Sequence, residues 1–179
     1  MGWKNFFDVN RLLAFTALFI SMLTFIIFVR QTNIMDQQSR LSVLPYLILE
    51  YNTNEPDSLV SIHLVNHGVG PAIISKRAFE YNSKTYEMDF RDFLTDQLPE
   101  MKDVRIISSA TLESGFAIPA GGAREIISVG GETYSYNKFR EIMAELVARE
   151  DFNYDIRFQS IYGDTWLLKK GSTKPVSIE

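Results

Sequence analysis

The sequence predicts one N-terminal transmembrane helix followed by a mainly-β domain, an antiparallel sandwich on which one amphipathic helix packs. Three observations carry this prediction: an uncharged apolar run near the N-terminus, a succession of short β-type runs separated by Gly- and Pro-containing turns, and one later segment with helical apolar spacing. Strands and helices do not alternate, which disfavours a parallel α/β fold. The expected parts are a flank (1–11), the transmembrane helix (12–30), a helical stalk (31–42), the β-sandwich-like domain (43–170) and a flexible tail (171–179).

Residues 12–29 read LLAFTALFISMLTFIIFV and contain no charged residue, no Pro and no Gly. As a helix, this run is about 27 Å long, close to the hydrocarbon thickness of a bilayer. The apolar region of a cleaved signal peptide is shorter and ends at a small-residue site, which FIIFVRQTN lacks. A buried helix of a soluble protein would show a polar face. We therefore expect an uncleaved single-pass signal anchor, with Trp3, Phe6 and Phe7 at the membrane interface.

The charges beside the span give its expected orientation. Lys4, Arg11 and the α-amino group precede the span, whereas Arg30 and Arg40 follow it. Because positive residues favour the cytoplasmic side, this small excess predicts a cytoplasmic N-terminus and an extracytoplasmic domain. The stalk, QTNIMDQQSRLS, carries too few apolar residues for a coiled coil, so we expect a spacer that ends before Pro45.

Short β-type runs make up most of the domain. Val60, Ile62 and Leu64 alternate with the residues between them, as in a strand with one buried face. We expect strands at 44–51, 59–66, 71–76, 78–82, 85–88, 105–112, 116–118, 125–129, 154–161 and 165–169, with a hairpin turn at NSK (82–84) and one or two helical turns at 90–98. These runs form the sheets of the predicted sandwich.

Residues 135–149 form the clearest helix of the domain. Apolar residues recur there at i, i+3, i+4, i+7 and i+8, which places them on one face: Phe139, Ile142, Met143, Leu146 and Val147. The side chains expected to face solvent are Lys138, Arg140, Glu141 and Glu145. A helix lying on a membrane would be rich in Lys and Arg on its polar face, whereas this face mixes both signs. We therefore expect the helix to cover a face of the sheet.

Composition excludes several classes of site. The chain of 179 residues contains no Cys, so it has no disulfide framework and no thiolate chemistry, and its histidines are His63 and His67. We place them in a strand and the turn after it, where a four-residue spacing need not bring them together, so we expect no metal site. The net charge is −4, and the first thirty residues carry a surplus of two positive charges, so the rest is acidic. That balance predicts no nucleic-acid partner.

The motif NHGVGPA, which begins at Asn66, follows a strand and has the Gly-x-Gly spacing of a nucleotide-binding loop. Pro71 follows Gly70 at once, the third glycine is missing, and no helical pattern comes next. We therefore interpret Asn66, Gly68, Gly70 and Pro71 as a structural turn, with the Asn side chain bonded to nearby backbone and Gly68 or Gly70 at positive φ. The later PAGGAR segment lacks the Lys-Ser/Thr of a P-loop and also predicts a turn.

Two further segments bear on function. Asp89, Asp92 and Asp96 form a charged segment, and paired carboxylates can perform acid–base chemistry, but a short helix there would present them to solvent. Tyr162 and Trp166 lie at and just after a predicted hairpin tip. The tryptophan suits a place in the core, and both residues are candidates for a contact surface. We assign no catalytic residue and no cofactor.

Three segments of the chain share a wider pattern. Their residues are Ser42, Val43, Pro45 and Tyr46; Asn66, Gly68, Gly70, Pro71 and Ala72; and Ser160, Tyr162 and Trp166. With the N-terminal span, this combination resembles a set of small bacterial single-pass membrane proteins of unassigned function. Relatives often carry cysteines around the last hairpin, and this chain has none. The resemblance implies the fold and an anchor in a bacterial inner membrane, and it implies no activity.

These expectations favour a non-enzymatic interaction or accessory module that is tethered to the lipid bilayer through residues 12–29 and binds a protein partner. One alternative is a membrane-anchored sensor or effector that binds a small ligand between helix 135–149 and the sheet. The other is a hydrolase that uses the carboxylates of residues 89–96.

Overall fold

A single long helix, α1 (Trp3–Leu41), begins the chain. The computed structural model describes residues 3–178, with side chains from residue 9 onward. The transmembrane helix expected at 12–30 and the stalk expected at 31–42 form one uninterrupted helix that ends at Leu41, one residue before the expected end of the stalk. The side chains of Trp3, Phe6 and Phe7, for which we expect an interfacial role, lie outside the described residues. Helix and domain form two compact units, Met1–Ser42 and Val43–Glu179.

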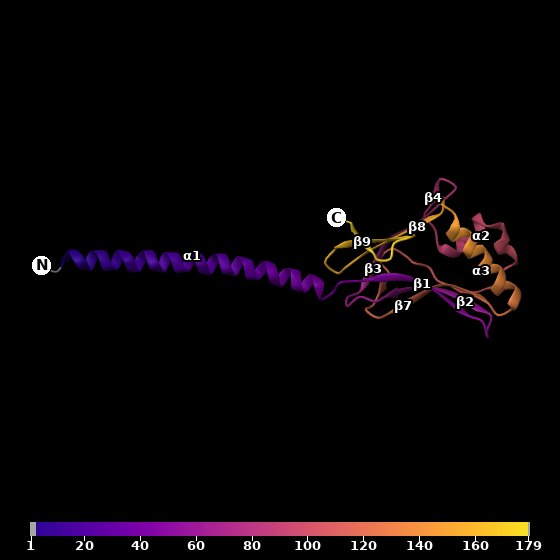
Figure 1. Ribbon diagram of the computed structural model, residues 1–179, viewed down its shortest axis with the longest axis horizontal. Coiled ribbons are helices and arrows are strands. Elements are labelled where there is room, and N and C mark those ends of the chain that lie inside the picture. Colours follow the sequence, from indigo (N-terminus) through magenta and orange to yellow (C-terminus); the bar gives the residue numbers. More distant parts are fainter. Residues whose placement is uncertain (1–2, 179) are drawn as a thin grey trace. The chain divides into compact units, whose positions relative to one another are not determined.

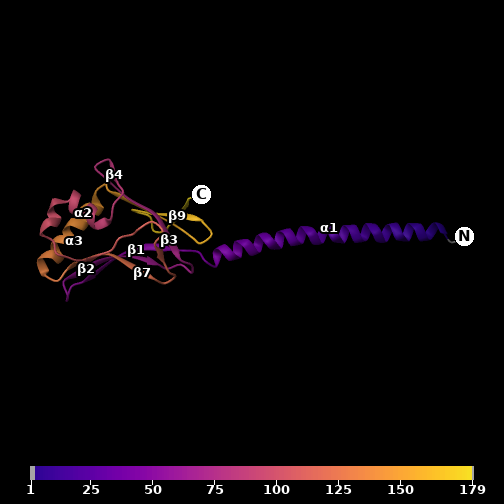
Figure 2. The same cartoon turned by 180° about the vertical axis from the view of Figure 1, so that it is seen from behind.

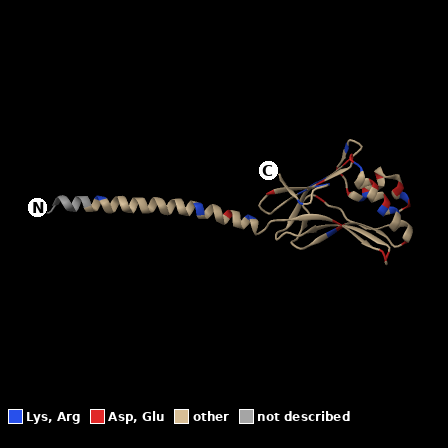
Figure 3. Ribbon diagram, in the orientation of Figure 1, with Lys and Arg blue, Asp and Glu red and all other residues tan. Residues whose placement is uncertain are grey.

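Helix α1 is long and apolar enough to span a membrane. Its part Val9–Leu41 has 33 residues and includes an apolar stretch that is not buried inside the protein. Figure 3 shows no charged residue between Arg11 and Arg30. The hydroxyls of Thr16 and Thr24 each donate to the carbonyl four residues earlier, both at 2.8 Å. These two polar side chains are therefore satisfied within the helix, as a hydrocarbon environment requires.

The domain is an antiparallel β-sandwich, as the sequence predicts. Its first sheet has the order β1-β2-β7-β5, built from β1 (Leu47–Asn54), β2 (Leu59–Asn66), β7 (Ala123–Gly130) and β5 (Ile106–Ser109). Its second sheet has the order β10-β9-β8-β3-β4, built from β10 (Val176–Ile178), β9 (Thr165–Lys169), β8 (Asn153–Gln159), β3 (Ala72–Tyr81) and β4 (Lys84–Tyr86), with β6 (Ala117–Ile118) also paired to β3. Every strand pairing in the described residues is antiparallel.

Three helical segments lie at the end of the sandwich where the two sheets separate (Figure 1): α2 (Phe90–Gln97), η1 (Pro99–Asp103) and α3 (Thr133–Ala148). Phe93 of α2 is fully buried and stacks on Phe79 of one sheet at 5.0 Å between ring centroids. It also stacks at 5.8 Å on Phe152, which precedes β8. Helix α3 buries Phe139 and Leu146, so its apolar stripe covers the core as expected. Figure 2 shows the same arrangement from behind.

Three local expectations need correction. Val147, expected on the buried stripe, is 49% exposed. The two strands expected at 71–76 and 78–82 are one strand, β3, with a register shift between Ile74 and Lys76. The expected flexible tail contains β10, which pairs with β9 and thereby satisfies backbone groups on the open edge of that strand. The NSK hairpin is confirmed, with Asn82 and Ser83 at φ 49° and 61°, as a two-residue primed turn requires.

Candidate functional site

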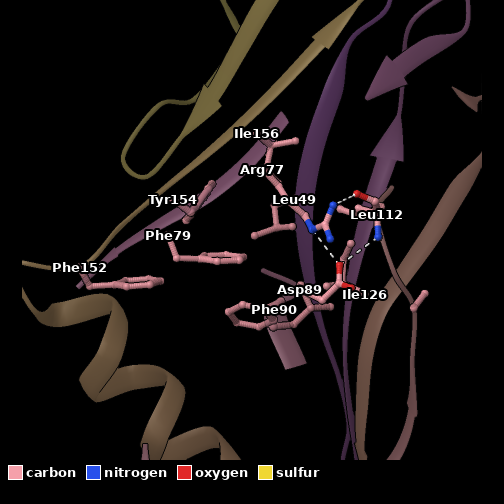
Figure 4. A pocket seen from close by; sticks show the side chains of 12 residues that line it. Leu49, Arg77, Phe79, Asp89, Phe90, Leu112, Ile126, Phe152, Tyr154 and Ile156 are labelled. Atoms are coloured by element: carbon pink, nitrogen blue, oxygen red, sulfur yellow. Dashed lines mark hydrogen bonds and ion pairs between the residues drawn. The ribbon is translucent and has the colours of Figure 1, made fainter. Parts of the chain in front are cut away.

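An apolar cavity of about 40 Å³ lies between the two sheets of the sandwich. Leu49, Ile62 and Ile126 reach it from the β1-β2-β7-β5 sheet. Phe79, Tyr154 and Ile156 reach it from the opposite sheet, and Phe90 of α2 and Phe152 line it as well (Figure 4). Alternate residues of a strand point to the same face, which is why Tyr154 and Ile156, two residues apart on β8, both line the cavity.

An ion pair closes one end of this cavity (Figure 4). Arg77 Nε lies 2.8 Å from Asp89 Oδ1, and Arg77 Nη1 donates to the Leu112 carbonyl. The Leu112 N–H donates in turn to Asp89 Oδ1 at 3.2 Å. The Nε contact meets the distance of an ion pair and lacks the alignment of a hydrogen bond. Both charges are therefore compensated within the protein, and this end presents no unpaired charge to the cavity.

A larger groove of about 490 Å³ lies over the cavity, between α3 and the edge strand β1. Leu49, Ile62 and Tyr154 line both the groove and the cavity, so the two are neighbouring parts of one apolar recess. Its outer walls are Tyr51 of β1 and the α3 residues Met143, Ala144 and Val147. The groove is open because side chains on the inner face of β1 become progressively more exposed, from buried Leu47 to Tyr51 at 46%.

Two cations stand at the rim of the groove, Arg140 from α3 and Lys170 after β9. Arg140 lies 5.2 Å over the ring of Tyr136 and donates to its hydroxyl at 3.3 Å. Its acidic neighbour is Glu55, 3.9 Å away and largely exposed, a geometry that contributes little. Lys170 Nζ donates to the backbone carbonyl of Phe152 at 3.1 Å and to that of Arg149 at the end of α3.

The two tyrosines of the groove remain protonated at neutral pH. Burial raises the pKa of Tyr154 above its ordinary value. Burial also raises the pKa of Tyr51, and the nearby positive charge of Arg140 offsets part of that shift. The recess therefore combines apolar walls with two protonated phenols, and its two cations lie apart, Arg140 beside Tyr136 and Lys170 beside Arg149 at the end of α3. Apolar walls with a few polar groups are typical of a site for a small, mostly apolar molecule.

The NHGVGPA turn is a structural junction, and the predicted bonding of Asn66 to nearby backbone is confirmed. The side chain is fully buried, and its Oδ1 accepts from Gly68 N at 3.0 Å and from Tyr46 N at 3.1 Å. Its Nδ2 donates to the carbonyls of Gly70, Ile118 and Pro119, at 2.8, 3.0 and 3.2 Å. One side chain thus joins its own turn, the first residues of the domain and the PAGGAR turn.

The prediction of a positive φ at Gly68 or Gly70 is wrong. The glycines of the described chain at positive φ lie elsewhere, and neither Gly68 nor Gly70 is among them. A Cβ at Gly68 would instead overlap the Leu44 carbonyl and Tyr46 N, and one at Gly70 would overlap the Val43 carbonyl. Both glycines are therefore needed so that the backbone of residues 43–46, where the chain enters the domain, can lie close to the turn. The two segments are more than twenty residues apart in the sequence. Pro71 directly precedes β3.

The other predicted residues do not gather at the groove. His63 Nε2 lies 3.0 Å from Ser61 Oγ, whereas His67 Nε2 lies 2.8 Å from Glu50 Oε1. Among the side chains of residues 9–178, no group of three His, Cys, Asp or Glu is arranged to hold a metal ion. Trp166 stacks on Phe158 at 5.9 Å and is half-buried against the core, while Tyr162 is 46% exposed at the hairpin tip. A contact surface there stays a prediction.

The aspartate segment divides into two parts. Asp92 and Asp96 are exposed on α2, as expected. Asp89 was expected beside them on the solvent face, and this is wrong, because its side chain is 18% exposed and pairs with Arg77. The Asp89 carboxylate is thus the one that reaches the interior, where it is paired with Arg77 at the end of the cavity.

Sequence reasoning placed a ligand site between helix 135–149 and the sheet without naming its residues. Leu49 and Tyr154 are large side chains within strands, and nothing in the sequence separates a groove wall from a core position. No family model, no curated protein and no solved structure matches this chain. The groove and the apolar helix are therefore the observations from which a function can be argued.

Proposed function

We propose that the chain is a membrane-tethered, non-enzymatic interaction or accessory module. The observation that carries the proposal is the division of the chain into an apolar helix long enough to span a bilayer and a separate domain with its own core. A tether of this kind raises the concentration of the domain near any partner in the same membrane. The partner class we favour is a membrane protein.

The test is co-purification of the full chain from membranes in a mild detergent. A stoichiometric protein partner, retained after a second purification step and lost when α1 is replaced by an unrelated span, supports the proposal. Recovery of the chain alone under conditions that preserve other membrane complexes contradicts it.

The proposed placement is the inner membrane of a bacterium, with the N-terminus in the cytoplasm and the domain outside. Lys4, Arg11 and the α-amino group support this orientation against Arg30 and Arg40. A phosphatase fused after the last residue should be active, because that enzyme folds in the extracytoplasmic space. Strong fluorescence from a reporter that matures only in the cytoplasm, fused at the same position, would reverse the orientation.

A second candidate function is a sensor or effector that binds a small ligand. The apolar groove between α3 and β1 favours it, since its volume of about 490 Å³ lies within the usual range of small-molecule sites. Thermal shift of the full chain in nanodiscs against a panel of metabolites tests this candidate. A shift that saturates with ligand concentration supports it.

A further inference from the structure

We propose that α1 pairs with α1 of a second copy of the chain, in the same direction, along a seam that runs from the membrane span into the stalk. This pairing goes beyond the proposed binding of another protein. It rests on the proposed tether, because insertion through one span gives both copies the same orientation. Three features of α1 support it: a heptad repeat, the placement of the charges, and apolar side chains exposed on the stalk.

An apolar residue recurs every seven positions along α1. The residues of this first row are Leu13, Ile20, Ile27, Ile34 and Leu41. A second row begins four positions further on and consists of Ala17, Thr24, Gln31 and Gln38. Steps of four and three residues average 3.5, the period of helices that wrap around each other in a left-handed coiled coil. Because α1 is uninterrupted, the two rows form one continuous seam through the span and the stalk.

The charged residues of α1 lie away from the seam. In the part of the helix with described side chains they are Arg11, Arg30, Asp36 and Arg40. Arg40 Nε lies 3.0 Å from Asp36 Oδ2, so these two charges compensate each other within one helix. A seam built on the row three positions after the first would include Arg30 and would bring two like charges together. The uncharged face is therefore the one on which two identical helices can meet.

In the stalk, the first row exposes apolar side chains to water. Ile34 is 54% exposed and Leu41 is 63% exposed. Both follow Arg30, where the apolar run has ended and the sequence is otherwise mostly polar. Lipid covers the same row inside the span, whereas only another apolar surface removes these two side chains from water. The matching row of a second copy lies at the same height in the membrane and supplies that surface.

The area needed for a specific interface fixes the length of the seam. Ile34 and Leu41 of two copies bury on the order of 400 Å², at about 100 Å² per side chain. A specific interface buries roughly 1,200–2,000 Å², so the stalk alone is too short. The complete seam, Leu13 to Leu41 in both copies, buries on the order of 1,500 Å². Lipid gives no hydrophobic driving force inside the span, so close packing at the small residues Ala17 and Thr24 contributes there.

Gln31 and Gln38 set the alignment of the two helices. In a parallel pair each glutamine faces its counterpart, and the amide of one can donate to the amide oxygen of the other. A shift of one helix along the other would place these amides against Ile34 or Leu41 and leave them without a partner. A polar residue in a seam fixes register and the number of helices at some cost in stability.

The experiment uses the full chain in isolated membranes and depends on the absence of cysteine from its sequence. Single cysteines are introduced in the stalk, and dimers formed on mild oxidation are measured on non-reducing gels. The seam variants are Ile34→Cys, Gln38→Cys and Leu41→Cys. The matched controls on the other side of the helix are Thr32→Cys, Asp36→Cys and Ser39→Cys. We expect at least fivefold more dimer from the seam variants. Equal cross-linking on both sides, or none at any of these positions, overturns the proposal.

A second arm breaks the seam in the stalk. Ile34→Glu combined with Leu41→Glu places like charges opposite each other in the pair. Energy transfer between donor- and acceptor-labelled copies in liposomes should then show at least tenfold weaker self-association. Thr32→Glu combined with Ser39→Glu adds the same charge away from the seam and should associate as the wild type does. Equal association of the seam variant and the wild type overturns the proposal.

Two further measurements separate this pairing from the proposed function. A chain that washes off membranes in carbonate refutes the tether, and with it both the proposed function and the pairing. A chain that stays in the membrane but shows no preference for seam cysteines refutes the pairing alone. Two differently tagged copies are also expressed together, and the cross-linked product should contain both tags. A product that joins the chain to a different protein, with the two tags never together, overturns the second copy and supports the proposed function.

Discussion

Asn66 provides the sharpest test of how the domain is held together. Its side chain is completely buried and joins three segments, through Tyr46 N, Gly68 N and the carbonyls of Gly70, Ile118 and Pro119. Asn66→Ala removes both the acceptor and the donor, and the backbone groups it served are left inside the protein without a partner.

The magnitude follows from the number of bonds. An amide has two hydrogens and one oxygen, so the three donor contacts share two hydrogens, and the side chain makes about four effective hydrogen bonds. At about 1 kcal/mol each, their loss costs about 4 kcal/mol, and unsatisfied buried groups raise the cost. That is a large part of the roughly 5–15 kcal/mol by which a domain is stable. Asn66→Asp keeps the acceptor but directs a carboxylate oxygen at three carbonyls, so its cost should be at least as large at neutral pH.

Pulse proteolysis of the membrane-inserted full chain in increasing urea measures this change. We expect the urea midpoint of Asn66→Ala to fall by at least 1 M, since small domains lose about 1–3 kcal/mol of stability per molar urea. Asn137→Ala, at an exposed position of α3, is the control and should shift the free energy of unfolding by no more than about 0.5 kcal/mol. A wild-type midpoint for Asn66→Ala would show that the network contributes nothing to stability.

The remaining predictions concern the anchor, the core, the turn and the titration of the groove. The full chain should resist carbonate extraction, and deletion of residues 1–30 should release a soluble domain; an intact chain that washes off membranes contradicts the anchor. Leu146→Ala should cost about 2–5 kcal/mol through the cavity it leaves, whereas exposed Val147→Ala should stay within about 0.5 kcal/mol, both read from urea unfolding. Gly70→Ala should destabilise the domain by more than about 1 kcal/mol, because a Cβ there overlaps the backbone of the entering chain, and an unchanged midpoint refutes that reason. Burial raises the pKa of Tyr154, so the protonated side chain contributes fully to the stability of the domain below the ordinary tyrosine pKa of about 10. That contribution is lost as the pH rises further. Tyr154→Phe should therefore flatten the decline of domain stability above that pH.

The regular elements could be predicted because their signals are local. The strand 59–66 has the predicted bounds, since it is set by alternation within its own residues, and the strand 165–169 has the predicted bounds as well. The helix expected at 135–149 is found at Thr133–Ala148 for the same reason. The tail was missed because three residues beside Pro175 carry little strand signal of their own, and pairing with β9 decides their conformation.

The turn shows where local reasoning ends. Two glycines after a strand favour positive φ if only the turn is considered. Their actual role is set by Val43 and Leu44, which pass against Gly70 and Gly68 from a distant part of the sequence. Asn66 follows the same logic, because two of its bonds are local and the others reach Tyr46, Ile118 and Pro119. Only the local bonds could be expected from the sequence.

The groove could be placed in outline and not in detail for a related reason. Arg140 and Lys170 stand 30 positions apart, and nothing in the sequence relates them until α3 and the chain after β9 come together. A sandwich gains stability when its apolar faces are fully covered, yet α3 places small Ala144 over the opening between the sheets, beside exposed Val147. The groove therefore leaves apolar side chains, Leu49 and Tyr154 among them, only partly buried.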